Sequence, residues 1–204
     1  MLSRRGRTLL VAGLGAVRLG ELAWSARNER RAGPGRAAAR RSYPAMVAVH
    51  AALFVVCLRA AAARRGTRDR RWRPAVDPGL EAVAMTGLAG ALLLRLWVIR
   101  TLGIAWNVRA VVPERMRVVR GGPYRWVRHP NYVAVAAEFA CLPVAVGAYR
   151  EAVLLSAANM LVLVPRVRGE ERLLEAVPGY RETFVGVPRF VPRWAPSPGR
   201  HPGG

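Results

Sequence analysis

Polar and aromatic side chains crowd the segment 119–132, which reads VRGGPYRWVRHPNY. Two glycines and a proline at 121–123 interrupt any helix, whereas Pro130 suits the first turn of a new helix, where its missing N–H costs nothing. Such residue types at the mouth of an apolar helix can bind and orient a polar ligand. The alternative is an interfacial belt of aromatic and arginine side chains, the interpretation that best suits Trp126. The candidate ligand-binding residues are Tyr124, His129, Pro130, Asn131 and Tyr132, with Arg128 beside them.

A second charged group follows the last apolar stretch, in the sequence PRVRGEERLL. Arg166 and Glu170 are four residues apart and share one face of a helix, while Glu171 points about 100° away. In isolation such a pair is an ordinary helix-stabilising ion pair worth about 0.3–0.5 kcal/mol. A hairpin of the last two apolar stretches would bring the pair next to His129.

Glu138 lies inside an apolar stretch, YVAVAAEFACLPVAVGAY. A carboxylate within a bilayer is costly and is a functional candidate by default. Glu138 follows Asn131 by seven residues, two helical turns along the same face. It is therefore a candidate catalytic base or a part of an acceptor pocket. The alternative is a structural ion pair with Arg95 of the third apolar stretch.

Five apolar stretches must position these groups: 8–26, 43–63, 79–99, 132–149 and 151–167. A membrane-spanning helix needs about 20 mostly apolar residues. The sequence predicts an all-α, polytopic membrane bundle of about five transmembrane helices. The last two are joined by 149–151 as a tight helical hairpin, and a tail rich in proline and glycine caps the bundle.

Composition supports a membrane protein and excludes other classes. Apolar residues make up 52% of the 204, which excludes disorder, and two cysteines exclude a disulfide scaffold. The net charge is +21, but the arginines flank long apolar runs instead of alternating with aromatic residues on a soluble face, so no nucleic-acid partner is expected.

Membrane orientation follows in part from the arginine blocks. Those at 27–41 and 64–73 flank the second stretch and cannot both be cytoplasmic if it crosses once, so the topology of the first three helices stays open. The basic segment 107–131 and the chain after 167 share a side. We place both in the cytoplasm, on a multi-pass protein of the cell membrane.

Three segments in this order and spacing, GPYRWVRHPNY, RVRGEERLL and GYRETFVGVPRFVP, resemble the isoprenylcysteine carboxyl methyltransferase family. The wider group includes the phospholipid methyltransferases. The resemblance covers about 106–193, and the N-terminal half matches only as apolar helices. We expect N-terminal transmembrane helices over 1–100, a catalytic region over 101–196 and a disordered tail over 197–204.

The resemblance implies a membrane enzyme that transfers a methyl group from S-adenosylmethionine, with no metal. The glycine-rich turn after a strand that soluble methyltransferases use is missing. By position, the family's substrate-contacting arginine is Arg166, which with Glu138 we take as catalytic. The tail offers Tyr180 and Arg189 as further contacts. The family's cofactor-binding positions fall on Met116, Arg117, Val118, Val119, Tyr124, His129, Pro130, Asn131, Tyr132 and Glu170.

Two lipophilic acceptors compete. A prenylcysteine carboxylate is already ionised and needs no base, so Arg166 would hold it by a charge-assisted pair. The ring hydroxyl of an alkylresorcinol or alkylpyrone must lose a proton, which gives Glu138 a role. The stretch WNVRAVVP, together with HPNY and Glu138, resembles bacterial relatives that act on such hydroxyls, and this resemblance favours the hydroxyl. Phospholipid N-methylation, an NADPH-dependent enzyme resembling sterol reductases and a non-enzymatic basic membrane protein remain alternatives.

Overall fold

The computed structural model describes residues 2–32, 35–37, 42–63, 77–113 and 118–193. The predicted cofactor contacts Met116 and Arg117 lie outside the described residues, as does the predicted disordered tail over 197–204.

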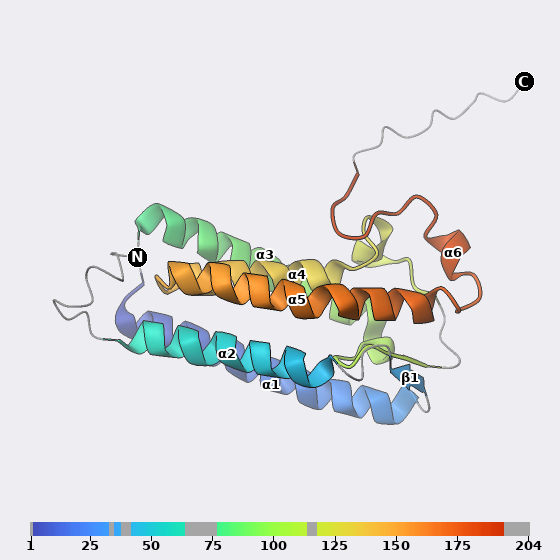
Figure 1. The fold of residues 1–204 in the computed structure, drawn as a ribbon, viewed down its shortest axis with the longest axis horizontal. Coiled ribbons are helices and arrows are strands. Elements are labelled where there is room, and N and C mark those ends of the chain that lie inside the picture. The colour runs from blue at the N-terminus through green and yellow to red at the C-terminus, as the bar shows by residue number, and fades with distance from the viewer. Residues whose placement is uncertain (1, 33–34, 38–41, 64–76, 114–117, 194–204) are drawn as a thin grey trace, which may run out of the picture.

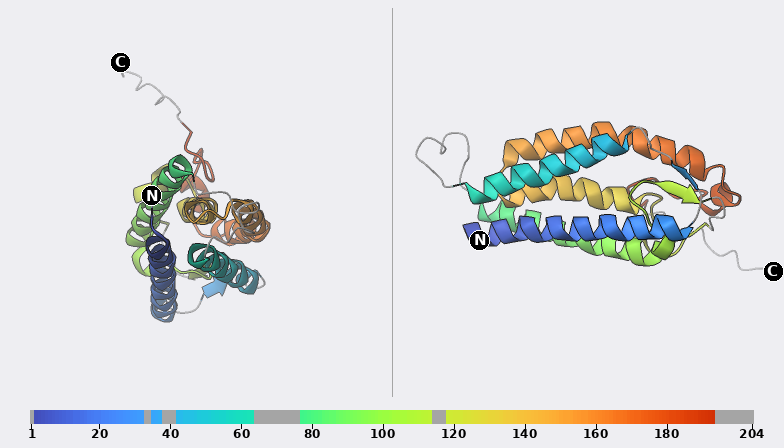
Figure 2. Two further views of the ribbon diagram at one scale, coloured as in Figure 1. Left: turned by 90° about the vertical axis from the view of Figure 1, so that its left-hand side faces the viewer. Right: turned by 90° about the horizontal axis from the view of Figure 1, so that it is seen from below.

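Among the described residues, five long helices form the bundle and run along a common axis (Figures 1 and 2). A short antiparallel pair of strands, β1 (Gly35–Ala37) and β2 (Val111–Pro113), and three short helical turns lie outside them. The turns are η2 (Gly103–Ala105), η3 (Gly122–Arg125) and α6 (Tyr180–Thr183). This arrangement confirms the all-α bundle. The long helices are α1 (Arg4–Ala32), α2 (Tyr43–Ala62), α3 (Pro78–Leu102), α4 (Pro130–Ala145) and α5 (Tyr149–Leu174).

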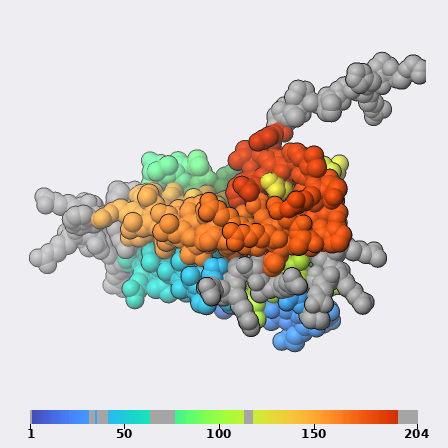
Figure 3. Space-filling model, turned by 45° about the vertical axis from the view of Figure 1, so that its right-hand side comes forward, coloured from blue at the N-terminus to red at the C-terminus, as the bar shows by residue number. Residues whose placement is uncertain are grey.

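Four of these helices are long and apolar enough to cross a membrane, namely α1, α2, α3 with its extension to Ala105, and α5. The remaining one, α4, has 16 residues and is shorter than a full span. Large apolar side chains face outward on the long helices, with exposed fractions of 79% for Leu161 and 72% for Leu9. Such surfaces are typical of helices in contact with lipid. Figure 3 shows α5 running along the outside of the molecule.

Local sequence sets the helix ends. Asp77 accepts a hydrogen bond from the backbone N–H of Leu80 at 2.8 Å and caps α3, and Pro78 follows at the first helical position. Pro130 opens α4 as predicted. The link between α4 and α5 lies at 146–148, where Gly147 adopts a φ of 78°, so the predicted link at 149–151 was three residues late.

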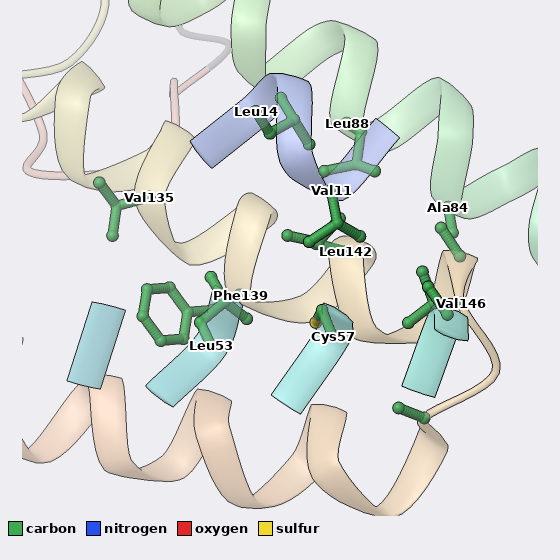
Figure 4. Close-up of a cluster of buried hydrophobic side chains, with 13 residues drawn as sticks. Val11, Leu14, Leu53, Cys57, Ala84, Leu88, Val135, Phe139, Leu142 and Val146 are labelled. Carbon is green, nitrogen blue, oxygen red and sulfur yellow. The ribbon is translucent and has the colours of Figure 1, made fainter. Parts of the chain in front are cut away.

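Apolar side chains pack into a core toward one end of the bundle. Figure 4 shows side chains of this core. Its side chains come from four helices, among them Val11 of α1, Leu53 of α2, Leu88 of α3 and Phe139 of α4. The other end is the one at which α6 and the C-terminal segment lie (Figure 1). The core holds the helices together toward one end, and the predicted polar residues of 118–132 and 166–170 gather toward the other.

Gly87 allows α3 and α4 to approach closely. A Cβ atom at Gly87 would lie 2.5 Å from the Cys141 sulfur, which is too close for real atoms. Small residues at such contacts are common between membrane helices, because they let backbones meet.

We expect Gly87→Ala to lower the thermal unfolding temperature in detergent, by an overpacking cost of about 1–3 kcal/mol. The double variant Gly87→Ala/Cys141→Ala removes the clashing sulfur and should recover most of the loss. Equal losses in the single and double variants would contradict this account of the helix contact.

Candidate functional site

A cavity of about 650 Å³ lies between the helices and reaches from the polar end of the bundle toward α1 and α2. Its volume is within the usual range for small-molecule sites, about 300–1,000 Å³. Glu138 and Pro130 are buried but are not among the residues that line it. The predicted site residues that do line it are Val118, Val119, Tyr124, His129, Asn131, Tyr132, Arg166 and Glu170.

Tyr132 connects the polar segment 119–132 with the charged pair Arg166 and Glu170. Its hydroxyl donates to a carboxylate oxygen of Glu170 and accepts from Nε of Arg166 at 3.1 Å. Nη2 of Arg166 donates to the backbone oxygen of Val108. Arg166 and Glu170 share a helix face, as their spacing predicts, but the hydrogen bonds connect them through Tyr132 of α4.

Glu171, which sequence reasoning passed over, fixes the C-terminal segment to the bundle. It accepts from His129 Nε2 at 3.1 Å and from Arg189 at 2.8 and 2.9 Å, and Arg128 lies 3.6 Å away. The backbone N–H groups of Arg128 and His129 donate to the carbonyls of Pro188 and Arg189 at 2.9 and 3.0 Å. The sequence signal for this role was the adjacent pair of glutamates in RVRGEERLL, of which Glu171 is the second. We call the contacts of 128–129 and Glu171 with 188–189 the C-terminal clasp.

Tyr180 and Phe184 close the polar end of the cavity over Val118 and Tyr124. Tyr180 thus lines the cavity, whereas Arg189 binds Glu171. Burial raises the pKa of the Tyr124 phenol and raises that of Tyr180 to about 12. Both hydroxyls are therefore neutral hydrogen-bonding groups near pH 7 and not phenolate bases.

A buried network of charges crosses the middle of the bundle. Arg18 donates to both carboxylate oxygens of Glu138, at 2.8–3.1 Å, and also to Glu21 at 2.6 Å. Arg95 binds Glu21 at 2.7–3.0 Å and donates to the Asn131 side chain at 3.2 Å. The sequence suggested Arg95 as a structural ion-pair partner of Glu138. That assignment was wrong, because the partner is Arg18. These five residues are called the charge network below.

The charge network borders the cavity. Arg18, Glu21 and Arg95 line it, while Glu138 lies behind Arg18 and is 2% exposed. Arg18 and Glu21 pair with each other, and each also binds a partner on another helix. Charged residues in apolar stretches were a signal for this network, but the matching of partners depends on how the helices pack.

The far part of the cavity is apolar and reaches the outer surface of the bundle. Gly15, His50 and Phe54 line it from α1 and α2. Leu19 and Val47 also line it and are nevertheless 68% and 41% exposed, so the cavity extends to the face that would meet lipid. One end is thus polar and the other is open to the bilayer.

These features define a class, a membrane-embedded helical bundle with one cavity that joins a polar cluster to a lipid-facing wall. A family model described as the isoprenylcysteine carboxyl methyltransferase (ICMT) family matches residues 83–176. The chain is also 30% identical over 169 residues to YpbQ of Bacillus subtilis (strain 168), a protein described as uncharacterized, covering 82% of this chain and 95% of that protein. The chain belongs to the isoprenylcysteine carboxyl methyltransferase family.

The described residues hold no group of three or more histidine, cysteine, aspartate or glutamate side chains placed to bind a metal ion.

Glu138→Ala should destabilise the protein by about 3–5 kcal/mol, because it removes a partner from a buried ion pair. Replacing both members, as Arg18→Met/Glu138→Met, should restore much of the stability, since Glu21 keeps Arg95. Thermal unfolding in detergent measures both variants. A Glu138→Ala protein as stable as wild type would show that the charge network does not support the fold.

The burial of Tyr180 should make the stability of the protein depend on pH in the alkaline range. Its folded pKa of about 12 lies above the ordinary value of 10.0, so its contribution to stability is complete below about pH 10 and is lost as pH rises toward 12. We expect the unfolding temperature of wild type to fall between pH 10 and 12, and Tyr180→Phe to fall less steeply. Identical pH profiles for the two proteins would contradict this.

Proposed function

We propose that the protein is a membrane O-methyltransferase that uses S-adenosylmethionine and methylates a hydroxyl group of a lipophilic acceptor. The observation that carries the proposal is a continuous cavity that connects the Tyr132–Arg166–Glu170 cluster with a wall open to lipid. A charged, water-soluble methyl donor would enter such a cavity from its polar end, and an apolar acceptor would enter it from the lipid. The two would then meet inside the cavity.

The polar end has the residues that the methyl donor requires. Nε of Arg128 is buried without a protein partner, which suits a donor that awaits an anionic ligand such as the carboxylate of the methyl donor. Glu170 would accept hydrogen bonds from ribose hydroxyls or an ammonium group. Tyr124 and Tyr180 would pack against the adenine or the sulfonium. When bound, S-adenosylmethionine would supply a methyl group on a cationic sulfur.

Arg166 would hold the acceptor oxygen beside Tyr132. Two of its guanidinium nitrogens already bind the protein, which leaves Nη1 as the nitrogen without a partner. A single such nitrogen suits one hydroxyl oxygen better than the two oxygens of a carboxylate. The apolar walls would exclude water and align the acceptor, which is the main requirement of a direct displacement.

A hydroxyl acceptor must lose its proton, and the charge network offers a place for it. Glu21 is the carboxylate of the network that lines the cavity, so it is our candidate to take the proton. Glu138 would act through Arg18, which it holds against the cavity wall. In this proposal Glu138 is a positioning residue.

We further propose that the polar end faces the cytoplasm, where S-adenosylmethionine is available. Arginines of the described residues gather there, at the end of α1, around η3, and from the end of α5 to the C-terminal clasp. This distribution agrees with the tendency of basic segments to remain cytoplasmic.

Calorimetric binding of S-adenosylmethionine to the detergent-purified protein tests the donor site. We expect wild type to bind and Glu170→Ala to bind at least ten-fold more weakly, because a charge-assisted contact is lost. Glu175→Ala is the matched control. It removes a glutamate one turn further on, whose partner Arg181 is 72% exposed, and should bind like wild type.

A folded wild type that does not bind the donor, alone or with an alkylresorcinol present, would contradict the proposal. NADPH would then be tested in the same way. If the donor binds, transfer of labelled methyl groups to an alkylresorcinol, a prenylcysteine and a phospholipid identifies the acceptor. Transfer to the prenylcysteine alone would assign the carboxylate, and transfer to the phospholipid alone an amine.

A further inference from the structure

Unpaired hydrogen-bond donors are concentrated at the cavity. Among the described residues, four buried side-chain nitrogen or oxygen atoms have no hydrogen-bond partner, and all four are nitrogen donors. Arg7 Nε lies away from the cavity, in a residue already paired with Glu81. The other three belong to cavity-lining residues, Arg128, Asn159 and Arg166. A ligand that satisfies them must present hydrogen-bond acceptors.

Asn159 is the member of this set that the proposed methyl transfer leaves without a role. It lies on α5 seven residues before Arg166, about two turns or 10 Å deeper along the same helix face. Its neighbours in the cavity wall include the apolar side chains of Val162 and Leu163. The residue is 3% exposed, and its amide nitrogen has no partner.

An unpaired amide in such a place is costly. Burying an amide without a hydrogen bond costs about 1–3 kcal/mol in proteins, and polar residues inside membrane spans tend to face functional cavities. A leucine of similar size would avoid that cost. The amide is therefore suited to a ligand that enters the cavity.

We propose that Asn159 recognises the acceptor by donating a hydrogen bond to a second, neutral oxygen, distinct from the oxygen that receives the methyl group. The occupant is a lipophilic molecule with two oxygen functions on a compact head, the second being a hydroxyl or carbonyl. Asn159 is uncharged, and the arginines of the charge network are already paired with carboxylates, so a neutral oxygen is the fitting partner. This inference rests on the proposed function, because it places the reacting oxygen at Arg166.

A pair of matched ligands tests Asn159 without relying on catalysis. An alkylresorcinol and an alkylphenol with the same saturated chain differ by one ring hydroxyl, and their affinities are measured by calorimetry in detergent. Wild type should bind the alkylresorcinol about ten-fold more tightly. Asn159→Leu should bind both alike, with affinity for the alkylphenol unchanged within about two-fold. The control Ser156→Ala, one turn earlier on α5 and outside the cavity lining, should keep the wild-type preference.

The results separate a recognition role from a structural one. Equal weakening of both ligands in Asn159→Leu, with a lower unfolding temperature, would mean that Asn159 only supports the helix packing and would overturn the inference. A retained ten-fold preference in Asn159→Leu would overturn it as well, and so would a wild type without any preference.

Failure of the proposed function gives a different pattern. A preference that depends on Asn159 in a protein that transfers no methyl group would overturn the proposed function and leave the binding role of Asn159 standing. Methyl transfer by a protein whose preference for the alkylresorcinol is unchanged in Asn159→Leu would support the proposed function and overturn the binding role of Asn159. Binding of S-adenosylmethionine should be unchanged in Asn159→Leu, which confirms that the variant is folded.

Discussion

Charged groups inside a bilayer must be paired, and this constraint organises the molecule. Arg18, Glu21, Arg95 and Glu138 come from three helices, and each finds its counter-charge within hydrogen-bonding distance. An unpaired charge at this depth would be strongly unfavourable. The register of α1 against α3 and α4 is therefore set by electrostatics as well as by packing, and the cavity wall is a product of that register.

The two ends of the bundle differ in structure. Toward one end apolar side chains from four helices pack beside the buried Arg7–Glu81 ion pair, and toward the other the helices enclose a cavity. The C-terminal clasp joins the end of α5 to the start of α4 through Glu171, so the chain beyond the last helix becomes part of the site. Rigidity at one end permits an open, ligand-sized space at the other.

Local signals in the sequence predicted most of the fold, and packing decided the rest. Apolar length located the helices, and Pro130 marked the start of α4. The spacing of Arg166 and Glu170 placed them on one face, but their link through Tyr132 needed the hairpin. The partner of Glu138 was not predictable, because Arg18 lies 120 residues away and only helix packing brings the two together.

The charge network also bears on how the protein is made. Synthesis proceeds from the N-terminus, so α1 reaches the membrane carrying Arg18 and Glu21 before α3 and α4 exist. The two residues are three apart and contact at 2.6 Å, so they can neutralise each other during that interval. Arg95 of α3 then arrives and binds Glu21, and Glu138 of α4 arrives and binds Arg18. The first helix thus carries an ion pair that is kept in the folded protein and binds the helices that follow.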